Sequence, residues 1–208
     1  MPDLRDRQLR PELPISAASE WDTRYRLNAG ISEPVTEAEV GLFLKHVGVQ
    51  PGQMALDAGC GTGAWARWLS RWGLGVLAMD VSPVALALAR QQGHDASLHY
   101  VRHDFDARAI PRSLAPSTLD LILCRDTLPY LDRERFLVDA RRWLAPTGRL
   151  VVTVPVAAGA RAASPWLAGL TREQIRALGA GWATRQDYTV TSTHACVVLG
   201  NSAETPRR

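Results

Sequence analysis

Three glycines separated by single residues, Gly59, Gly61 and Gly63, follow an apolar stretch that ends in an aspartate, Asp57. Glycine lets a loop turn tightly and lets a ligand approach the backbone, because no Cβ stands in the way. Such a loop at the end of a strand is typical of sites for nucleotide-containing ligands. Asp57 directly before the loop is a poor neighbour for a pyrophosphate and a good one for an ammonium group.

A second aspartate, Asp80, ends the next apolar stretch, and an acid at that position can accept hydrogen bonds from both hydroxyls of a ribose. In an open sheet of parallel strands, ligands bind at the carboxyl ends of the strands. We therefore expect Asp57, the glycine loop and Asp80 to line one pocket for an adenosine-containing ligand.

Apolar, strand-like segments alternate with amphipathic helical segments through the middle of the chain. This alternation indicates right-handed βαβ crossovers and a mostly parallel, doubly wound sheet. The predicted strands are 53–59, 74–80, 97–104, 118–126 and 148–156, and the predicted helices between them are 63–73, 82–93 and 132–145. Two further helices are predicted before the first strand, at 19–28 and 33–49.

The end of the chain departs from this alternation. A short helix at 171–181 precedes two strand-like segments, 182–193 and 194–201, with no room for a crossover helix between them. A short connection implies an antiparallel hairpin. The prediction is an α/β, Rossmann-like, doubly wound, seven-stranded sheet, mostly parallel, with an antiparallel C-terminal hairpin strand and N-terminal helices.

The length, charge and cysteine content of the chain exclude several classes of function. The 208 residues favour one domain, predicted at 19–208, after a loosely ordered arm at 1–18. The net charge of +3 is spread along the chain, so we expect no nucleic-acid partner. We expect no secretory signal, no membrane span and, from three scattered cysteines without a CxxC pair, a cytoplasmic location and no metal site. The oligomeric state is left open.

Five segments in order resemble the motifs of class I S-adenosylmethionine-dependent methyltransferases. "ALDAGCGTGAW" resembles motif I, "VLAMDVSP" and "VRHDFD" resemble the next two, and "LDLILCRDTLPYL" and "WLAPTGRLVVTV" resemble the regions around strands four and five. The resemblance covers roughly residues 19–200. It implies S-adenosyl-L-methionine as the cofactor and S-adenosyl-L-homocysteine as its product.

The resemblance also implies roles for single residues. The loop would cradle the methionine part of the cofactor, Asp80 would hold the ribose hydroxyls and Val81 would pack on the adenine. Asp104 would lie near the adenine amino group, and Phe105 would donate its backbone amide. The cofactor-binding set implied by these motifs is Asp57, Gly59, Cys60, Gly61, Gly63, Asp80, Val81, Asp104, Phe105, Cys124 and Arg125.

"WDTRYR" upstream resembles a segment of the thiopurine and tellurite-resistance methyltransferases, whose helix closes over the cofactor. Trp21, Arg24 and Tyr25 would then cover its methionine end; ordinary amphipathic packing is the alternative. Arg125 matches an arginine of that group, but Asp126 stands where the group has a glycine.

For the acceptor side, Asp126, Tyr130 and Trp166 follow strands four and five and are the candidate substrate contacts. Asp126 is the candidate catalytic residue, as a base or an orienting group, with a turn or helix cap as the alternative. Alternation along strand three places the side chain of His103 opposite that of Asp104, so we expect a core or surface histidine. His194 begins the last strand, and nothing in the sequence marks it as functional.

The predicted function is methyl transfer to a small-molecule acceptor by in-line displacement, which depends mainly on positioning, with at most an auxiliary base. Two alternatives remain open at this point. One is a protein that binds the same cofactor without methyl transfer, or uses the fold for different chemistry. The other is an NAD-dependent oxidoreductase, because "GCGTGA" also fits a dinucleotide fingerprint.

Overall fold

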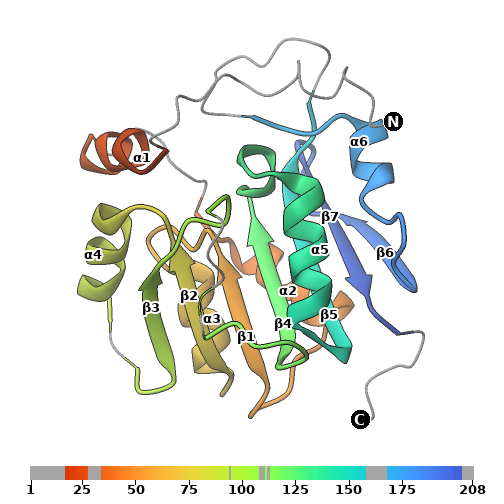
Figure 1. Ribbon diagram of the computed structural model, residues 1–208, viewed down its shortest axis with the longest axis horizontal. Coiled ribbons are helices and arrows are strands. Elements are labelled where there is room, and N and C mark those ends of the chain that lie inside the picture. Colours follow the sequence, from red (N-terminus) through yellow and green to blue (C-terminus); the bar gives the residue numbers. More distant parts are fainter. Residues whose placement is uncertain are drawn as a thin grey trace.

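The computed structural model describes residues 17–27, 34–93, 95–107, 111, 113–157 and 168–202 (Figure 1). Its strands form one seven-stranded sheet with the order β3-β2-β1-β4-β5-β7-β6. The strands are β1 (Met54–Ala58), β2 (Gly75–Asp80), β3 (Leu98–Arg102), β4 (Leu119–Arg125), β5 (Leu144–Pro155), β6 (Thr184–Thr189) and β7 (His194–Gly200). The helices are α1 (Ala17–Arg26), α2 (Glu37–His46), α3 (Ala64–Arg71), α4 (Pro83–Gln91), the short 3-10 helix η2 (Leu128–Tyr130), α5 (Arg133–Trp143) and α6 (Arg172–Ala177).

The pairing of the strands confirms the predicted fold. Strands β3, β2, β1, β4 and β5 are parallel to one another, and β7 is antiparallel to both β5 and β6. A dinucleotide-binding sheet has a sixth parallel strand beside the fifth, in the order 3-2-1-4-5-6. Here the antiparallel β7 occupies that place, so the topology disfavours the dinucleotide alternative.

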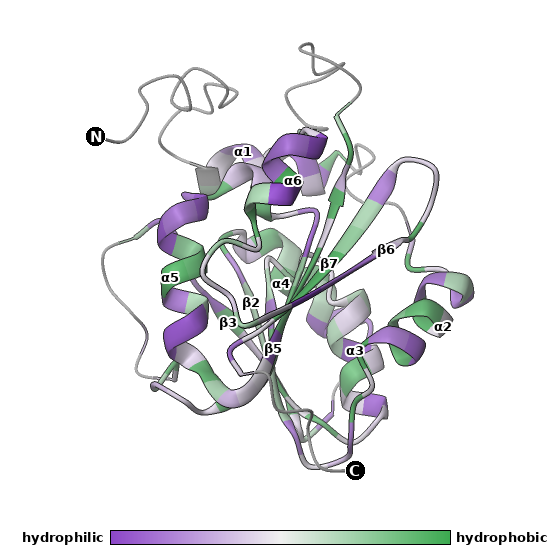
Figure 2. Ribbon diagram, turned by 90° about the vertical axis from the view of Figure 1, so that its right-hand side faces the viewer, coloured by the Kyte–Doolittle hydropathy of each residue, from purple (hydrophilic) through white to green (hydrophobic). Residues whose placement is uncertain are grey.

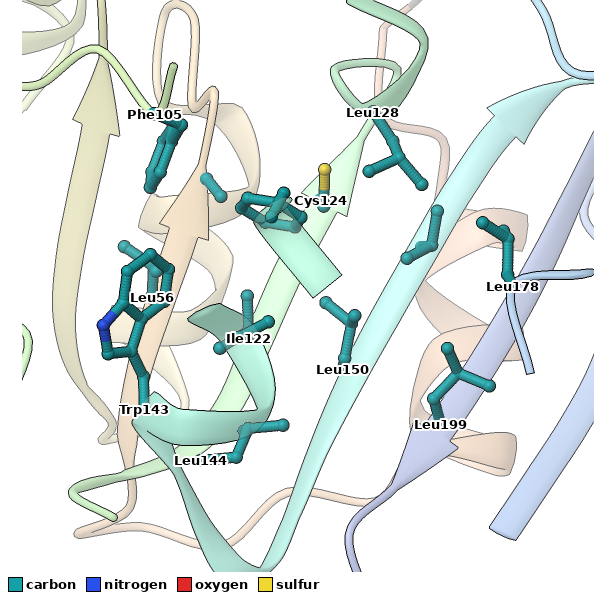
Figure 3. Close-up of a cluster of buried hydrophobic side chains, with 14 of the residues drawn as sticks. Leu56, Phe105, Ile122, Cys124, Leu128, Trp143, Leu144, Leu150, Leu178 and Leu199 are labelled. Carbon is teal, nitrogen blue, oxygen red and sulfur yellow. The ribbon is translucent and has the colours of Figure 1, made fainter. Parts of the chain in front are cut away.

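Helices cover both faces of the sheet, and the strand residues alternate between two buried clusters. On one face, α2 and α3 supply Phe43 and Leu69, which pack with Ala55 of β1. On the other face, α5 supplies Phe136, which packs with Leu56. Figure 3 shows the second cluster, with side chains from β1, β4, β5, β7 and α5 meeting at one place. Burial on both faces explains why the central strands are nearly continuous apolar runs.

Strand β5 begins earlier than expected. It starts at Leu144 rather than at residue 148, because Leu144 pairs with Leu119 before a register shift that brings Arg149 opposite Leu121. The sequence pattern predicted that the preceding helix ends at residue 145, since Pro146 cannot continue a helix. The earlier strand start depends on the pairing of Leu144 with β4, which the local sequence does not show.

Strand β6 lies at the edge of the sheet and is polar, in contrast to β7 beside it (Figure 2). Arg185 and Asp187 stand on this strand and form an ion pair of 2.9 Å with each other. Charged side chains on an edge strand hinder its pairing with the strand of another molecule. Within the described ranges, every helix is too short or too polar to span a bilayer.

Helix α1 lies against the start of α4, at the carboxyl ends of the strands (Figure 1). The Asp22 carboxylate accepts hydrogen bonds from the Ser82 hydroxyl and, at 3.3 Å, from the amide of Val84. Ser82 is itself the predicted N-cap of α4, and its hydroxyl accepts from the amide of Ala85. Helix α1 begins at Ala17, two residues before the predicted start of the domain, and residues 1–16 lie outside the described part of the chain. The division into an arm and one domain stays a prediction.

A buried ion pair fixes α2 to the end of β4. The guanidinium of Arg125 donates from Nε to Glu39 Oε1 at 2.8 Å and from Nη2 to Glu39 Oε2 at 3.2 Å. The two side chains are only 10% and 7% exposed. Such a two-point contact between a guanidinium and a carboxylate fixes geometry as well as charge.

We expect Glu39→Ala to lower the free energy of unfolding by about 1.5–3 kcal/mol, because it removes the two-point partner of the buried Arg125 guanidinium while the contact of Arg125 with Asp126 remains. Denaturant unfolding followed by circular dichroism measures this. The matched control is Glu37→Ala on the same helix, where the side chain is exposed and the change should stay near 0.5 kcal/mol. Equal effects of the two substitutions would contradict the role given to this pair.

Candidate active site

A pocket of about 600 Å³ opens at the carboxyl ends of β1, β2 and β4, beneath α1. The strand order reverses between β1 and β4, which is where ligands bind in sheets of this kind. Its volume lies in the range of cofactor and small-molecule sites. Of the residues predicted for the site, the pocket is lined by Trp21, Tyr25, Asp57, Gly59, Cys60, Gly61, Asp80, Val81, Asp104, Phe105, Arg125, Asp126 and Tyr130.

The loop after β1 accepts only glycine at two of its positions. Gly59 has φ +72°, and a Cβ there would lie 2.1 Å from the hydroxyl oxygen of Thr127. Gly61 has φ +52°, and a Cβ there would lie 2.8 Å from the hydroxyl oxygen of Tyr25. Both the left-handed backbone and the close approach exclude a larger residue. The loop thus passes tightly between β4 and α1.

Asp57 is a buried carboxyl with an unpartnered oxygen. It is 3% exposed, its carboxylate has a hydrogen bond with the amide of Ala66 in the first turn of α3, and Oδ2 has no hydrogen-bond partner. Burial raises the pKa of Asp57 to about 7, the Ala66 amide opposes this shift, and the nearby Asp80 carboxylate adds to it. A buried acceptor without a partner is costly, so its presence at a pocket indicates a ligand donor. A cationic donor would restore the low pKa of a carboxylate.

Asp80, at the end of β2, fixes the glycine loop that follows β1. Its Oδ2 accepts from the amide of Gly61 at 2.9 Å, and its Oδ1 accepts from the amide of Ser82 at 2.8 Å. Burial raises the pKa of Asp80, and these two amides oppose that shift. Because a carboxylate accepts about four hydrogen bonds and the amide of Val81 also interacts with Asp80, this carboxylate keeps room for a ligand hydroxyl.

The next segment of the pocket follows β3. Asp104 is exposed, and its Oδ1 accepts from the amide of Asp106 at 2.9 Å. The ring of Phe105 is buried, with its centroid 5.5 Å from that of Phe136 in an edge-on contact. The anchored ring fixes the backbone of this segment at the pocket.

His103 also lines the pocket, which the sequence did not predict. Alternation along strand three put its side chain opposite that of Asp104, but β3 ends at Arg102, so alternation no longer applies at residue 103. Its ring meets the ring of Phe105 edge-on, at 4.8 Å between centroids. Partial burial lowers the pKa of His103.

Helix α1 forms one wall of the pocket. Burial, followed by the charge of Asp80, raises the pKa of Tyr25 well above its usual value, and its hydroxyl lies over Gly61. The ring of Trp21 meets that of Tyr130 edge-on, at 5.0 Å between centroids. Arg24 is buried but is not among the lining residues; its guanidinium lies 5.2 Å from the Trp21 ring centroid. Two of the three predicted covering residues therefore reach the pocket, and Arg24 packs behind one of them.

Two other predicted residues lie away from the lining. Cys124 is fully buried in the hydrophobic cluster beneath the pocket, as Figure 3 shows, so a direct contact of its side chain with a ligand is not supported. Gly63 is the N-cap of α3, with φ +75°, and serves to turn the chain into the helix. Trp166 lies outside the described residues.

Charged side chains gather at the end of the pocket formed by β4. The Arg125 guanidinium, already paired with Glu39, also approaches Asp126, with 3.0 Å between Nη1 and Oδ2. The other oxygen of Asp126 lies 3.5 Å from Nε2 of His194. Glu39 and His194 carried no functional signal in the sequence, because each reaches the site from an element distant along the chain.

Comparison with known proteins agrees with this geometry. Residues 56–152 match the family model of a methyltransferase domain. The mitochondrial ubiquinone biosynthesis O-methyltransferase of Schizosaccharomyces pombe is 30% identical over 103 residues, which is 49% of this chain and 38% of that protein. The chain thus spans well under half the length of this curated relative.

Solved structures show the same fold at low identity. A phosphoethanolamine N-methyltransferase 2 of Haemonchus contortus in complex with S-adenosyl-L-methionine aligns with a TM-score of 0.69 at 17% identity, over 97% of this chain and 60% of that one. The [4+2]-cyclase SpnF aligns with a TM-score of 0.71 at 16% identity, over 92% and 98% of the two chains. The resemblance of "WDTRYR" to the thiopurine and tellurite-resistance group stays a prediction. The strand order, the loop after β1 and the matched domain make this chain similar to class I S-adenosylmethionine-dependent methyltransferases.

Proposed function

We propose that this protein transfers a methyl group from S-adenosyl-L-methionine to a small-molecule acceptor. The observation that carries the proposal is the unpartnered Oδ2 of Asp57, buried beside the glycine loop. A primary ammonium group is the donor that fits this oxygen, and the amino acid end of the cofactor supplies one.

The residues of the pocket fit the rest of the cofactor. The glycine loop lets the backbone approach the methionine part, and Asp80 at the end of β2 accepts from the ribose hydroxyls. Val81, Asp104 and Phe105 then surround the adenine. Tyr25 lies over the loop and excludes water from the methionine end. The bound cofactor supplies a methyl group on a positively charged sulfur, ready for in-line displacement.

The protein's own contribution to the transfer is positioning and desolvation. Trp21 and Tyr130 meet at the pocket edge-on, and Asp126 and Arg125 stand at the end of β4, so aromatic and polar surfaces face the acceptor. Tyr130 is held in place because its hydroxyl accepts from the amide of Ala168 at 3.1 Å.

We further infer a small acceptor and no nucleic-acid partner, since the mild positive charge is spread along the chain. The relative named as a ubiquinone biosynthesis O-methyltransferase supports a small acceptor. Three unpaired cysteines, Cys60, Cys124 and Cys196, support a reducing, cytoplasmic location. The near-complete use of arginine in place of lysine supports a bacterial source with GC-rich codons.

A second candidate is different chemistry on the same cofactor-binding fold. The likeness to the [4+2]-cyclase SpnF favours keeping it, because this fold also occurs in a protein named for a cyclisation. Detection of methylated product together with S-adenosyl-L-homocysteine supports methyl transfer. Conversion of an acceptor without that product supports the second candidate.

Calorimetric titration tests the cofactor. We expect micromolar binding of S-adenosyl-L-methionine and of S-adenosyl-L-homocysteine, and no heat of binding with NAD or NADH. The physical reason is that the site has a carboxylate, Asp57, where a dinucleotide would place its pyrophosphate. Binding of NADH without the other two would contradict the proposal.

Asp80→Ala should abolish this binding, because it removes both the ribose acceptor and the bond to the Gly61 amide that shapes the loop. Asp126→Ala is the matched control, as a second pocket carboxylate at the acceptor end, and should leave the dissociation constant within about threefold. The same calorimetry measures both, with thermal unfolding to confirm that each variant folds. Equal loss in both variants would place Asp126 in the cofactor site.

The pKa of Asp57 predicts a pH dependence of binding. The ammonium group needs the ionised carboxylate, so affinity should rise with pH up to about pH 7, by at most about tenfold per pH unit, and then level off. In Asp57→Asn the affinity should be weaker and nearly independent of pH over this range. Titrations at several pH values measure the slope.

Unfolding of the cofactor-free protein gives an independent check on Asp57. Its folded pKa of about 7 exceeds the unfolded value of 3.8, so its share of stability should fall as pH rises from about 4 to 7. Asp57→Asn should remove this loss and raise the unfolding midpoint at pH 8 by at least roughly 2–4 °C, the shift expected for 1 kcal/mol at this size. An unchanged unfolding midpoint would show that burial does not raise the pKa of Asp57.

A further inference from the structure

Asp126 has a backbone conformation that favours glycine. Its φ is +59°, and its amide is fixed by donation to the carbonyl of Thr153 at 2.8 Å. The left-handed conformation is uncommon for residues with a side chain, although aspartate tolerates it better than most. Residues held in such conformations cluster at functional sites. A carboxylate is therefore retained here against the backbone preference.

The two oxygens of this carboxylate have different surroundings. Oδ2 lies 3.0 Å from the Arg125 guanidinium, which keeps the side chain oriented. Oδ1 is buried, has no hydrogen bond within normal geometry, and lies 3.5 Å from Nε2 of His194. The side chain lines the pocket at the acceptor end. One oxygen of Asp126 is thus anchored by Arg125, and the other faces the imidazole of His194.

The sheet brings His194 to this position from the far end of the chain. Strand β7 is antiparallel to β5, so its first residue, His194, pairs with Pro155 at the carboxyl end of β5. Parallel β4 ends at the same edge, where Arg125 pairs with Thr153. On its other side, the Nδ1 atom of His194 lies 3.0 Å from the hydroxyl of Thr193 and 3.3 Å from that of Thr191. The imidazole is therefore held between hydroxyl groups and the Asp126 carboxylate.

We propose that Asp126 and His194 form the proton-accepting pair of the methyl transfer, and that the acceptor is a neutral hydroxyl compound, such as a phenol. This inference rests on the proposed function and deepens it. Asp126 touches the acceptor, since it lines the pocket, while His194 is not among the lining residues and acts through Asp126.

A lone pair of the hydroxyl oxygen forms the new bond to the methyl carbon as the bond from that carbon to sulfur breaks. The hydroxyl proton passes to the carboxylate of Asp126, whose Oδ1 faces Nε2 of His194, and from this carboxylate to the imidazole. The products are a methyl ether, a neutral thioether and an imidazolium, and the carboxylate is again ionised. The negative charge of Asp126 is thus restored beside the new imidazolium, which stabilises the separated proton.

Other charged and titratable groups face the pair from the packed elements. Arg125 of β4 contacts Asp126 and is neutralised by Glu39 of α2. Tyr130 of η2 and Cys124 of β4 both interact electrostatically with Asp126, and burial raises the pKa of each. Both of these groups therefore stay protonated near neutral pH.

Nuclear magnetic resonance of labelled histidine tests the pair directly in the whole protein. The signal of His194 is assigned by its loss in His194→Gln. We expect His194 to titrate about one pH unit lower in Asp126→Asn than in the wild type, because the carboxylate that favours the imidazolium is gone. His103 lines the same pocket beside a different carboxylate, Asp104, and its titration should not move. An unchanged titration of His194 would overturn the proposal.

The cofactor complexes then test whether the pair faces the transferred methyl. His194 should titrate lower with S-adenosyl-L-methionine than with S-adenosyl-L-homocysteine, since only the former carries a positive sulfur. Equal values in two complexes of proven occupancy would overturn the proposal. Failure of both ligands to bind in calorimetry would instead defeat the proposed function, while the comparison of wild type with Asp126→Asn in the free protein still decides whether the pair exists.

Kinetics with catechol as the hydroxyl probe and benzoate as an already ionised probe test the catalytic role. We expect Asp126→Asn and Asp126→Gly to lower kcat for catechol about 100-fold or more, the usual contribution of a general base, with the KM for the cofactor unchanged. The loss should be greatest at neutral pH and smaller at alkaline pH, where catechol ionises without help. Transfer to benzoate alone, at a rate that these variants leave unchanged, would overturn the proposal.

Asp126→Gly separates the catalytic role from a structural one. Glycine suits the left-handed backbone at this position, so the unfolding midpoint should be equal to or above that of the wild type while activity falls. His194→Gln should shift the pH profile of kcat and lower it less than Asp126→Asn does. Loss of activity only in proportion to loss of folded protein would mark Asp126 as a turn residue and overturn the proposal.

Discussion

The reversal of strand order between β1 and β4 is the constraint on which the site depends. From β1 the following strands β2 and β3 are added on one side, and from β4 the following strand β5 is added on the other. The loops at the carboxyl ends of β1 and β4 therefore diverge and leave a pocket between them. Asp57, Asp80 and Arg125 each stand at the last or nearly last position of one of these strands. Their side chains converge because the strand ends do.

The buried charged groups at the two ends of the pocket differ in how they are compensated. Beside the glycine loop, Asp57 has an oxygen without a hydrogen-bond partner, and burial raises the pKa of this carboxyl to about 7. Beside the end of β4, Glu39 and Arg125 compensate each other, Arg125 also contacts one oxygen of Asp126, and the other, buried oxygen lies 3.5 Å from Nε2 of His194. The first end suits binding of a fixed positive charge, and the second suits movement of a proton.

The antiparallel β7 has a consequence beyond closing the sheet. A parallel strand beside β5 would place its carboxyl end at the pocket, as β4 does. Because β7 runs the other way, the first residue of this strand, His194, lies at the same edge as the last residues of β4. The reversed strand therefore places His194 beside Asp126.

The sequence by itself determined the sheet, the antiparallel hairpin and the glycine loop with Asp57 and Asp80, because periodicity, caps and glycine spacing are local properties. It did not determine that Cys124 and Arg24 lie behind the pocket, that His103 faces it, or that β5 begins at Leu144. Only the tertiary structure decided these points and the meeting of Glu39, Arg125, Asp126 and His194. Side chains from α2, β4 and β7 meet there through strand register and helix packing, and neither leaves a periodic signal along the chain.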